Sequence, residues 1–199
     1  MHEINKIGIK RLLKDVNKLK MTDEDRWNFK SYIEFLRYFR HLKVIRLNHF
    51  LIGSHFAYGW MPTMLRLFPK TKANNKSIHN PRTVLKILNK VKRNNTINTN
   101  EMDILKTSIN NSLVGTSKLL HFINPKNYPI WDARVVKYLN LKNHNVRNVE
   151  YYECFRKRCN EIGKEGKFLK FHRKVESLVK NKVTAYRAIE FVMWKSARK

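Results

Sequence analysis

Apolar residues recur at helical spacing along almost the whole chain, and no stretch of any length alternates apolar and polar residues as a β-strand would. Helix boundary signals punctuate this pattern: Thr22 and Asp25 have the spacing of a capping box, and Pro81 stands at the start of another apolar run. No repeat and no Ser/Gly-rich linker divides the chain. The pattern therefore predicts an all-α fold, a compact bundle of two packed helical lobes in a single domain over residues 1–199.

Helices are expected over residues 3–19, 22–52 with a kink near 41–43, 64–68, 81–91, 99–109, 117–123, 133–139, 148–161, 165–181 and 184–198. Gly53, Gly59 and Pro62 interrupt the helical pattern, so residues 53–63 are expected to form a loop. Residues 70–80 are polar and basic and are expected to form a surface loop. In this scheme Thr99 caps its helix, and the active-site segment covers residues 99–140.

The chain is strongly basic, with 42 Lys and Arg against 15 Asp and Glu and a formal net charge of +27. A charge this one-sided costs self-repulsion and is typical of proteins that bind a polyanion. No run of 18 apolar residues could span a membrane, and the first residues lack the apolar core of a secretion signal. We therefore expect a cytoplasmic, nucleoid-associated monomer that binds double-stranded DNA and no membrane.

The two cysteines, Cys154 and Cys159, lie five residues apart on an expected helix and near its opposite faces. This spacing suits neither a disulfide nor a shared metal, and it cannot supply the four thiolates of an iron–sulfur cluster. We expect reduced thiols, no metal and no cofactor.

The most informative stretch is Ser112–Leu139, which combines a tight turn at Val114–Ser117, a short helix, a proline-punctuated loop and a second helix. Asn124 precedes Pro125 and should end the first helix, because the residue before proline is pushed out of the α region. Asp132 stands directly before the next periodic run, which is an N-cap position.

Two residues in this stretch can carry chemistry. Lys118 is expected in the first turn of its helix, where the helix dipole disfavours a cation and so eases formation of a neutral, nucleophilic amine. Asp132 is the only acidic residue between Asp103 and Glu150, and a carboxylate in so basic a segment should stay ionised. The structural alternatives are a solvated surface lysine and an aspartate that serves only as a cap.

With Val114-Gly115-Thr116, Lys118 and Tyr128-Pro129-Ile130-Trp131-Asp132 in this order, the segment resembles the active-site region of the helix-hairpin-helix DNA glycosylases of the 8-oxoguanine glycosylase type. The resemblance covers about 30 residues, with one glycine where the family hairpin usually has two and with Ser117 inserted before the lysine. It implies that Lys118 is the Schiff-base nucleophile and Asp132 the essential carboxylate. It also implies a DNA-binding hairpin at Leu113, Val114, Gly115, Thr116 and Ser117.

An enzyme of this kind must evert its target base from the duplex into a pocket. Six residues are candidates for that pocket, four of them from the expected loop 53–63 and two from the active-site segment: Phe56, Tyr58, Trp60, Met61, His121 and Trp131. The structural alternative is that these side chains fill the core between helices.

The sequence thus predicts a DNA glycosylase with AP-lyase activity that excises a damaged or modified base. The base remains open between an oxidised purine, which indicates repair, and a bulky modified pyrimidine of phage DNA, which indicates antiviral defence. Two alternatives from other classes are a non-catalytic basic DNA- or RNA-binding protein and a basic effector or toxin that clamps DNA. The binding protein explains the charge fully but gives Asp132 no role, and the effector or toxin is the weaker alternative.

Overall fold

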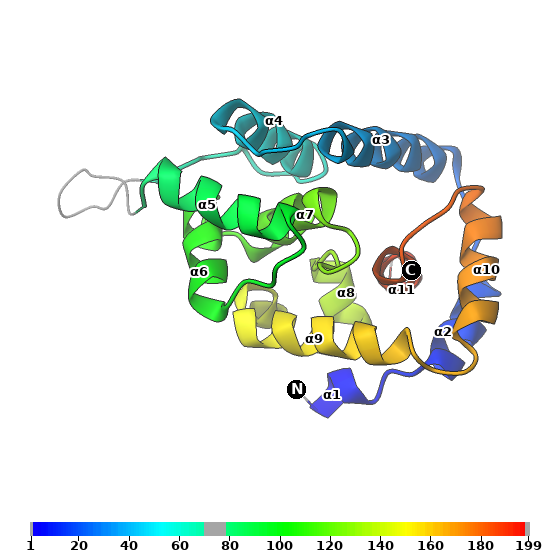
Figure 1. Cartoon of the computed structure of the whole chain (residues 1–199). Helices are drawn as coiled ribbons and strands as arrows, with labels where there is room; N and C mark the ends of the chain where they lie inside the picture. Colours follow the sequence, from blue (N-terminus) through cyan, green and yellow to red (C-terminus); the bar gives the residue numbers. More distant parts are fainter. Residues whose placement is uncertain (1, 70–78, 198–199) are drawn as a thin grey trace.

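The computed structural model describes residues 2–69 and 79–197, and within these ranges the fold is all-helical. Figure 1 shows the arrangement of the helices, with bounds α1 His2–Asn5, α2 Ile9–Val16, α3 Asp23–Arg40, α4 Leu47–Tyr58, α5 Pro81–Lys92, α6 Thr99–Ser108, α7 Leu113–Ile123, α8 Ala133–Tyr138, the 3-10 helix η1 Asn143–Arg147, α9 Val149–Ile162, α10 Phe168–Val179 and α11 Ala185–Ser196. In the part of the chain described, no helix combines the length and apolarity that crossing a membrane requires.

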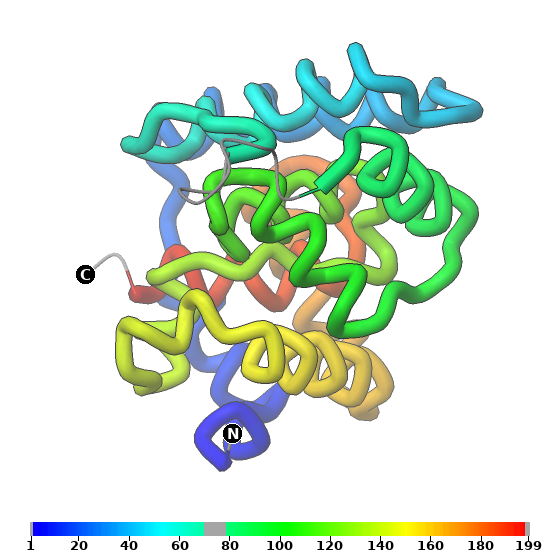
Figure 2. Tube along the Cα trace, turned by 90° about the vertical axis from the view of Figure 1, so that its left-hand side faces the viewer, coloured from blue at the N-terminus to red at the C-terminus, as the bar shows by residue number. Residues whose placement is uncertain are grey.

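Helix α7 lies at the centre of the bundle, packed against α3, α4, α5, α6 and η1 (Figures 1 and 2). Its residues are buried with the exception of Val114, which is half-buried. On the other side of the molecule α11 packs against α2, α8, α9 and α10. Two almost fully buried helices, α7 and α11, therefore form the interior of the fold, and the remaining helices cover them.

Several boundary signals in the sequence act as expected. Thr22 and Asp25 form the capping box that starts α3, and Pro81 occupies the first turn of α5. Helix α7 ends at Ile123, directly before Asn124 and Pro125, and the Asp132 side chain caps α8. These predictions are confirmed because each depends on a hydrogen bond or steric clash within a few residues along the chain.

Four expected elements and one expected helix cap differ from the structure. Residues 3–19 form two helices separated at Gly8, and residues 22–52 form two separate helices, α3 and α4. Helix α4 continues through Gly53 to Tyr58, so the loop expected at 53–63 begins only at Gly59. Residues 64–68 are not helical, since Leu67 pairs with Ile109 in an isolated β-bridge. The cap of α6 is Asn98, and Thr99 is its first residue.

The turn before α7 also differs from the expectation. Val114, Gly115, Thr116 and Ser117 lie inside α7, and the chain turns instead at Asn110 and Asn111, which adopt φ of 56° and 50°. The Asn110 side chain accepts a hydrogen bond from the amide of Arg66 and donates one to the carbonyl of Met64, 2.8 Å away. Asparagine tolerates the left-handed region, so Asn110 and Asn111 form the tight turn that the sequence pattern assigned to Gly115. The surface loop expected at 70–80 falls mostly outside the described residues.

Gly53 is in the interior of α4 because α4 approaches its neighbours closely there. A Cβ at this position would lie 2.3 Å from Cζ of Phe39 and 2.9 Å from Cδ1 of Leu119. We expect Gly53→Ala to lower the free energy of unfolding by about 1–3 kcal/mol, despite the better helix propensity of alanine. Urea denaturation measures this, with Gly166→Ala as the control because a Cβ there meets no atom within 4 Å. Equal stability of the two variants would contradict this close packing.

Candidate functional site

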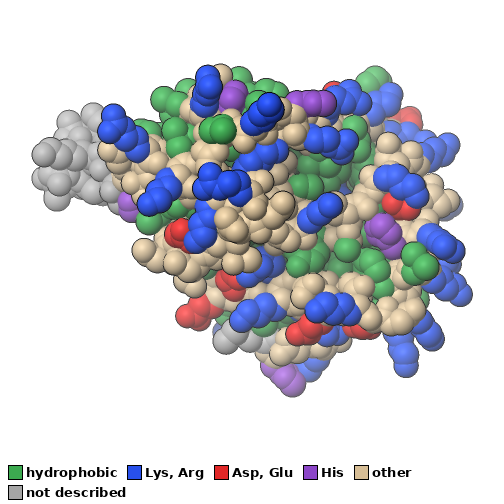
Figure 3. All heavy atoms as spheres, in the orientation of Figure 1, with side chains coloured by type: hydrophobic (Ala, Val, Ile, Leu, Met, Phe, Trp, Pro, Cys, Tyr) green, Lys and Arg blue, Asp and Glu red, His purple; other side chains and the backbone are tan. Residues whose placement is uncertain are grey.

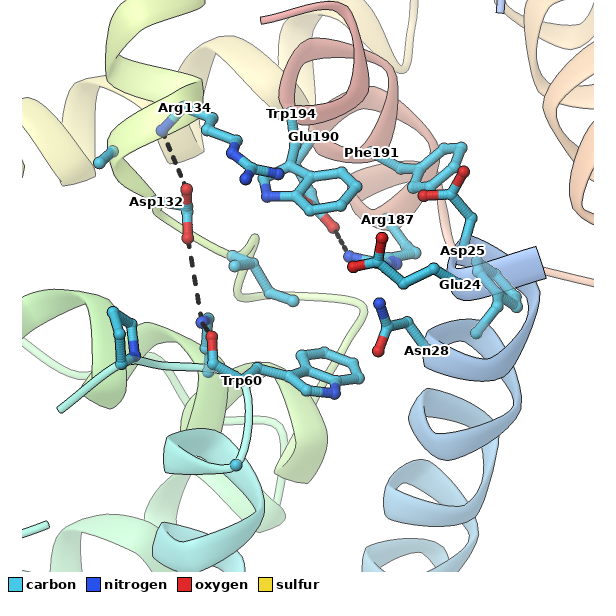
Figure 4. A pocket seen from close by; sticks show the side chains of 16 residues that line it. Glu24, Asp25, Asn28, Trp60, Asp132, Arg134, Arg187, Glu190, Phe191 and Trp194 are labelled. Carbon is cyan, nitrogen blue, oxygen red and sulfur yellow. Dashed lines mark hydrogen bonds and ion pairs between the residues drawn. The ribbon is translucent and has the colours of Figure 1, made fainter. Parts of the chain in front are cut away.

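A pocket of about 510 Å³ opens between the central helix α7, the start of α8, the first turns of α3 and the buried helix α11. Figure 4 shows that its side chains come from segments far apart in the sequence, including Asn28 of α3, Trp60 after α4, Asp132 before α8 and Trp194 of α11. Lys118, which also lines the pocket, comes from α7. The pocket therefore lies where three segments of the chain meet, residues 24–62, 118–134 and 187–194.

Lys118 and Asp132 meet in the wall of this pocket. The Nζ atom of Lys118 lies 3.9 Å from Oδ2 of Asp132 and donates a hydrogen bond to the carbonyl of Trp60, 3.2 Å away. Oδ1 of Asp132 accepts a hydrogen bond of 2.9 Å from the amide of Arg134. One carboxylate oxygen thus caps α8 while the other faces the lysine.

The position of Asp132 relative to α7 is fixed by hydrogen bonds along the preceding loop. The hydroxyl of Ser117 accepts a hydrogen bond of 3.0 Å from the amide of Trp131 and lies 3.2 Å from its carbonyl oxygen. Farther back, Nδ1 of His121 lies 2.7 Å from the carbonyl oxygen of Tyr128. Because Ser117 directly precedes Lys118 and Trp131 directly precedes Asp132, this contact holds the amine and the carboxylate in register.

Burial lowers the pKa of the Lys118 amine, whose side chain is only 5% exposed, and the negative charges of Asp132 and Glu190 partly oppose the shift. The expectation that the helix dipole would lower it was wrong. Lys118 is the sixth residue of α7, beyond the first turn in which a dipole acts. The pKa of Lys118 is therefore lowered, as the sequence predicted, but the cause is the burial of its amine within the bundle and not the helix dipole.

Aromatic side chains from the turn after α4 and from α11 flank the pocket. The indoles of Trp60 and Trp194 lie on opposite sides of it in Figure 4. Trp60 stacks on Tyr32 with a centroid distance of 6.3 Å, and the guanidinium of Arg134 lies 4.8 Å from the ring centre of Trp194. A planar group that enters this space can stack on either ring.

Of the six residues expected to form a base pocket, Trp60 lines the pocket and the other five do not. Tyr58 packs against Gly115, where a Cβ would lie 2.6 Å from its Cε2 atom. The remaining four are held by the core: Phe56 stacks on Phe35, Met61 packs against the core, His121 is fully buried against Tyr32, and Trp131 is fully buried and donates to the carbonyl of Val146.

The expected DNA-binding turn Leu113–Ser117 is likewise part of a packed helix, and all but Val114 of these residues are buried. The hydroxyl of Ser112 caps this helix by accepting a hydrogen bond from the amide of Gly115. Asn111 is exposed, and Asn110, Ser112 and Val114 are partly exposed, so the accessible part of this region is the turn before α7 rather than the helix itself. Figure 3 shows Lys and Arg side chains spread over the face it displays.

Four residues of α11 in the pocket wall were not anticipated from the sequence: Arg187, Glu190, Phe191 and Trp194. The sequence signal was the presence of an oppositely charged pair, Arg187 and Glu190, at helical spacing on a helix that is otherwise apolar on most sides. Buried charges are rare unless they are paired, so this pair marks a site. In α3, Glu24 and Asp25 indicated only the start of a helix, and no sequence signal singled out Asn28.

Glu190 is 1% exposed and is paired with Arg187, whose guanidinium also lies 4.5 Å from the ring centre of Tyr32. Burial raises the pKa of the Glu190 carboxyl to about 7, against the opposing charge of Arg187. The wall behind Lys118 therefore holds a carboxyl group that changes its charge close to neutral pH.

The raised pKa of Glu190 predicts a specific pH dependence of stability. The folded protein binds this proton up to about pH 7 and the unfolded chain only up to about pH 4.5, so the free energy of unfolding falls as pH rises through that interval. Glu190→Gln should remove this contribution, which is roughly 3 kcal/mol over the full interval. Urea denaturation of both proteins at pH 5 and pH 8 measures it. If the difference in free energy of unfolding between the two proteins is the same at pH 5 and pH 8, the raised pKa of Glu190 is refuted.

In the described ranges, no three His, Cys, Asp or Glu side chains are grouped so that they could hold a metal ion. Comparisons with protein-family models, curated proteins and solved structures find no match to this chain. The functional reading therefore rests on the pocket, the lysine–aspartate pair and the charge of the chain.

Proposed function

We propose that the protein is a DNA glycosylase that takes an everted base into the pocket between α7 and α11 and releases it through a Schiff base on Lys118. The observation that carries this proposal is the buried Lys118 amine, its pKa lowered, 3.9 Å from the Asp132 carboxylate in the pocket wall. A surface lysine or a purely structural cap would need neither the burial nor the pocket. The local sequence resemblance to helix-hairpin-helix glycosylases supports the same roles.

In the proposed reaction the neutral amine of Lys118 forms a bond to C1′ of the nucleotide. The glycosidic bond breaks, and its electron pair leaves with the base, which takes up a proton. Asp132 stabilises the positive charge that develops on the sugar and accepts the proton that the attacking nitrogen loses. The ring C1′–O4′ bond then breaks, and O4′ takes up the proton held by Asp132, which gives the Schiff base. Loss of a C2′ proton to a base with departure of the 3′ phosphate would then cut the strand.

The formal charge of +27 supports DNA as the substrate, because lysines and arginines neutralise phosphates independently of sequence. The partly exposed indoles of Trp60 and Trp194 supply stacking surfaces for a base outside the duplex. A non-catalytic nucleic-acid-binding protein would also be basic, but it would have no use for a lysine that is 4% exposed beside a pocket. The proposal so far includes two classes of target base, an oxidised purine and a modified pyrimidine.

Covalent trapping tests the proposal. The protein is incubated with a duplex that contains one abasic site in the presence of borohydride, which reduces a Schiff base to a stable amine. We expect a cross-linked species on a denaturing gel, and no such species with intact unmodified duplex. Tight, salt-dependent binding of the abasic duplex with no adduct at any pH between 6 and 9 would instead favour the binding-protein alternative.

A further inference from the structure

The pocket is larger than a nucleobase needs. Its volume of about 510 Å³ falls in the range of roughly 300–1,000 Å³ that is typical of sites enclosing ligands of drug size. Enzymes that evert a base hold it in a close-fitting pocket, because stacking and edge contacts supply the selectivity. An unmodified base bound beside Lys118 would therefore leave part of this pocket unfilled.

The two ends of the pocket differ in chemistry. Lys118 and Asp132 define the end at which the sugar must lie, since the amine has to reach C1′. Figure 4 shows Glu24, Asp25 and Asn28, from the first turns of α3, on the opposite side from Asp132, with Trp60 and Trp194 between the two sides. We call the part of the pocket lined by these three α3 residues the distal lobe. A base stacked between the indoles would point its far edge into the distal lobe.

The distal lobe is polar without a large net charge. Asp25 is buried and paired with Lys195, and Glu190 nearby is paired with Arg187. Carboxylate oxygens accept hydrogen bonds, while the Asn28 amide both donates and accepts them. Since Lys195 already pairs with Asp25 of the lobe, and Arg187 with the nearby Glu190, the lobe suits neutral hydroxyl groups better than it suits a cationic group.

From this arrangement we propose that the substrate is a pyrimidine carrying a hydroxylated substituent at C5, such as a hydroxymethyl group or a sugar linked through one, with the substituent bound in the distal lobe. This inference rests on the proposed glycosylase function. The C4–C5 edge of a pyrimidine lies across the ring from the glycosidic nitrogen, so a C5 substituent extends toward α3 while C1′ stays beside Lys118. The single ring stacks between Trp60 and Trp194, and the substituent fills the remaining volume.

Base release from a set of otherwise identical duplexes tests the inference. The duplexes differ at one test position, which carries cytosine, 5-hydroxymethylcytosine, glucosylated 5-hydroxymethylcytosine or 8-oxoguanine. Mass spectrometry measures the base that is released. We expect release of the glucosylated base to exceed release of cytosine and of 8-oxoguanine by about 100-fold. Equal or faster release of 8-oxoguanine would overturn the inference while leaving the glycosylase function in place.

A pair of variants at Asn28 probes the distal lobe itself. Asn28→Trp fills the lobe and should lower release of the glucosylated base by about 10-fold or more, whereas Asn28→Ala keeps the space and should cost less. Adduct formation with abasic duplex involves no base, so it reports on folding and on Lys118 in both variants. If Asn28→Trp releases the glucosylated base as fast as the unaltered protein, the substituent does not bind there. If no duplex gives adduct or free base, the glycosylase proposal falls, and this inference with it.

Discussion

Replacing Lys118 by methionine is expected to abolish the borohydride-trapped adduct and to lower base release by about 10³-fold or more, because the nucleophile is removed. Methionine has a similar length and suits the 4% exposed position, so the pocket keeps its shape. Removal of the amine also leaves the Asp132 carboxylate and the carbonyl of Trp60 without this partner, so we expect the free energy of unfolding to fall by about 1–3 kcal/mol. Gel analysis of the trapped complex and urea denaturation measure the two effects.

The matched control for this prediction is Lys92→Met. Burial also lowers the pKa of Lys92, but its Nζ atom donates to the carbonyl of Phe39, 2.6 Å away, and it is not part of the pocket wall. We expect this variant to form the adduct as the unaltered protein does. Loss of the adduct in Lys92→Met but not in Lys118→Met would reverse the assignment of the nucleophile.

Asp132→Asn is expected to separate the two roles of the aspartate. Asparagine is as good an N-cap as aspartate, so α8 should keep its cap and the protein its stability. The negative charge that faces Lys118 is lost, and we expect base release to fall by about 10²–10⁴-fold. Adduct formation with a preformed abasic site should fall less. No bond to a base is broken there, and loss of the Asp132 charge lowers the pKa of the amine further.

Asp132→Ala provides the comparison, since it removes both the charge and the cap. It should lose activity to the same extent as Asp132→Asn and also lose about 1 kcal/mol of stability. Thermal unfolding and base release of both variants, measured side by side, distinguish the roles. If Asp132→Asn releases base at the rate of the unaltered protein, the aspartate is only a helix cap.

Local signals in the sequence were sufficient to predict the order of elements around the site. The proline after Asn124 and the position of Asp132 fix the end of α7 and the start of α8 through interactions within a few residues. Asp132 was singled out as an N-cap and as a lone carboxylate in a basic segment, whereas Lys118 was singled out for an expected place in the first turn of its helix, which it does not occupy. That these two side chains meet depends on the contact between Ser117 and Trp131 across the loop, which only the three-dimensional structure displays.

The features that could not be predicted depend on packing between distant segments. Gly115 and Gly53 suggested turns, but each allows a close approach inside a helix, to Tyr58 and to Phe39. Loop aromatics suggested a stacking site, yet the bundle buries most of them and brings Trp194 from α11 to face Trp60. Neither the periodicity nor the charge pattern contains the information about which aromatic side chains stay at the surface of a pocket.

Peptide mapping of the borohydride-reduced complex tests the central claim most directly. The protein is trapped on a duplex with one abasic site, the DNA and the protein are digested, and mass spectrometry locates the lysine that carries the sugar remnant. The account predicts that the remnant is on Lys118, within the peptide that contains α7. A remnant on any other lysine, or one spread over many surface lysines, would contradict it.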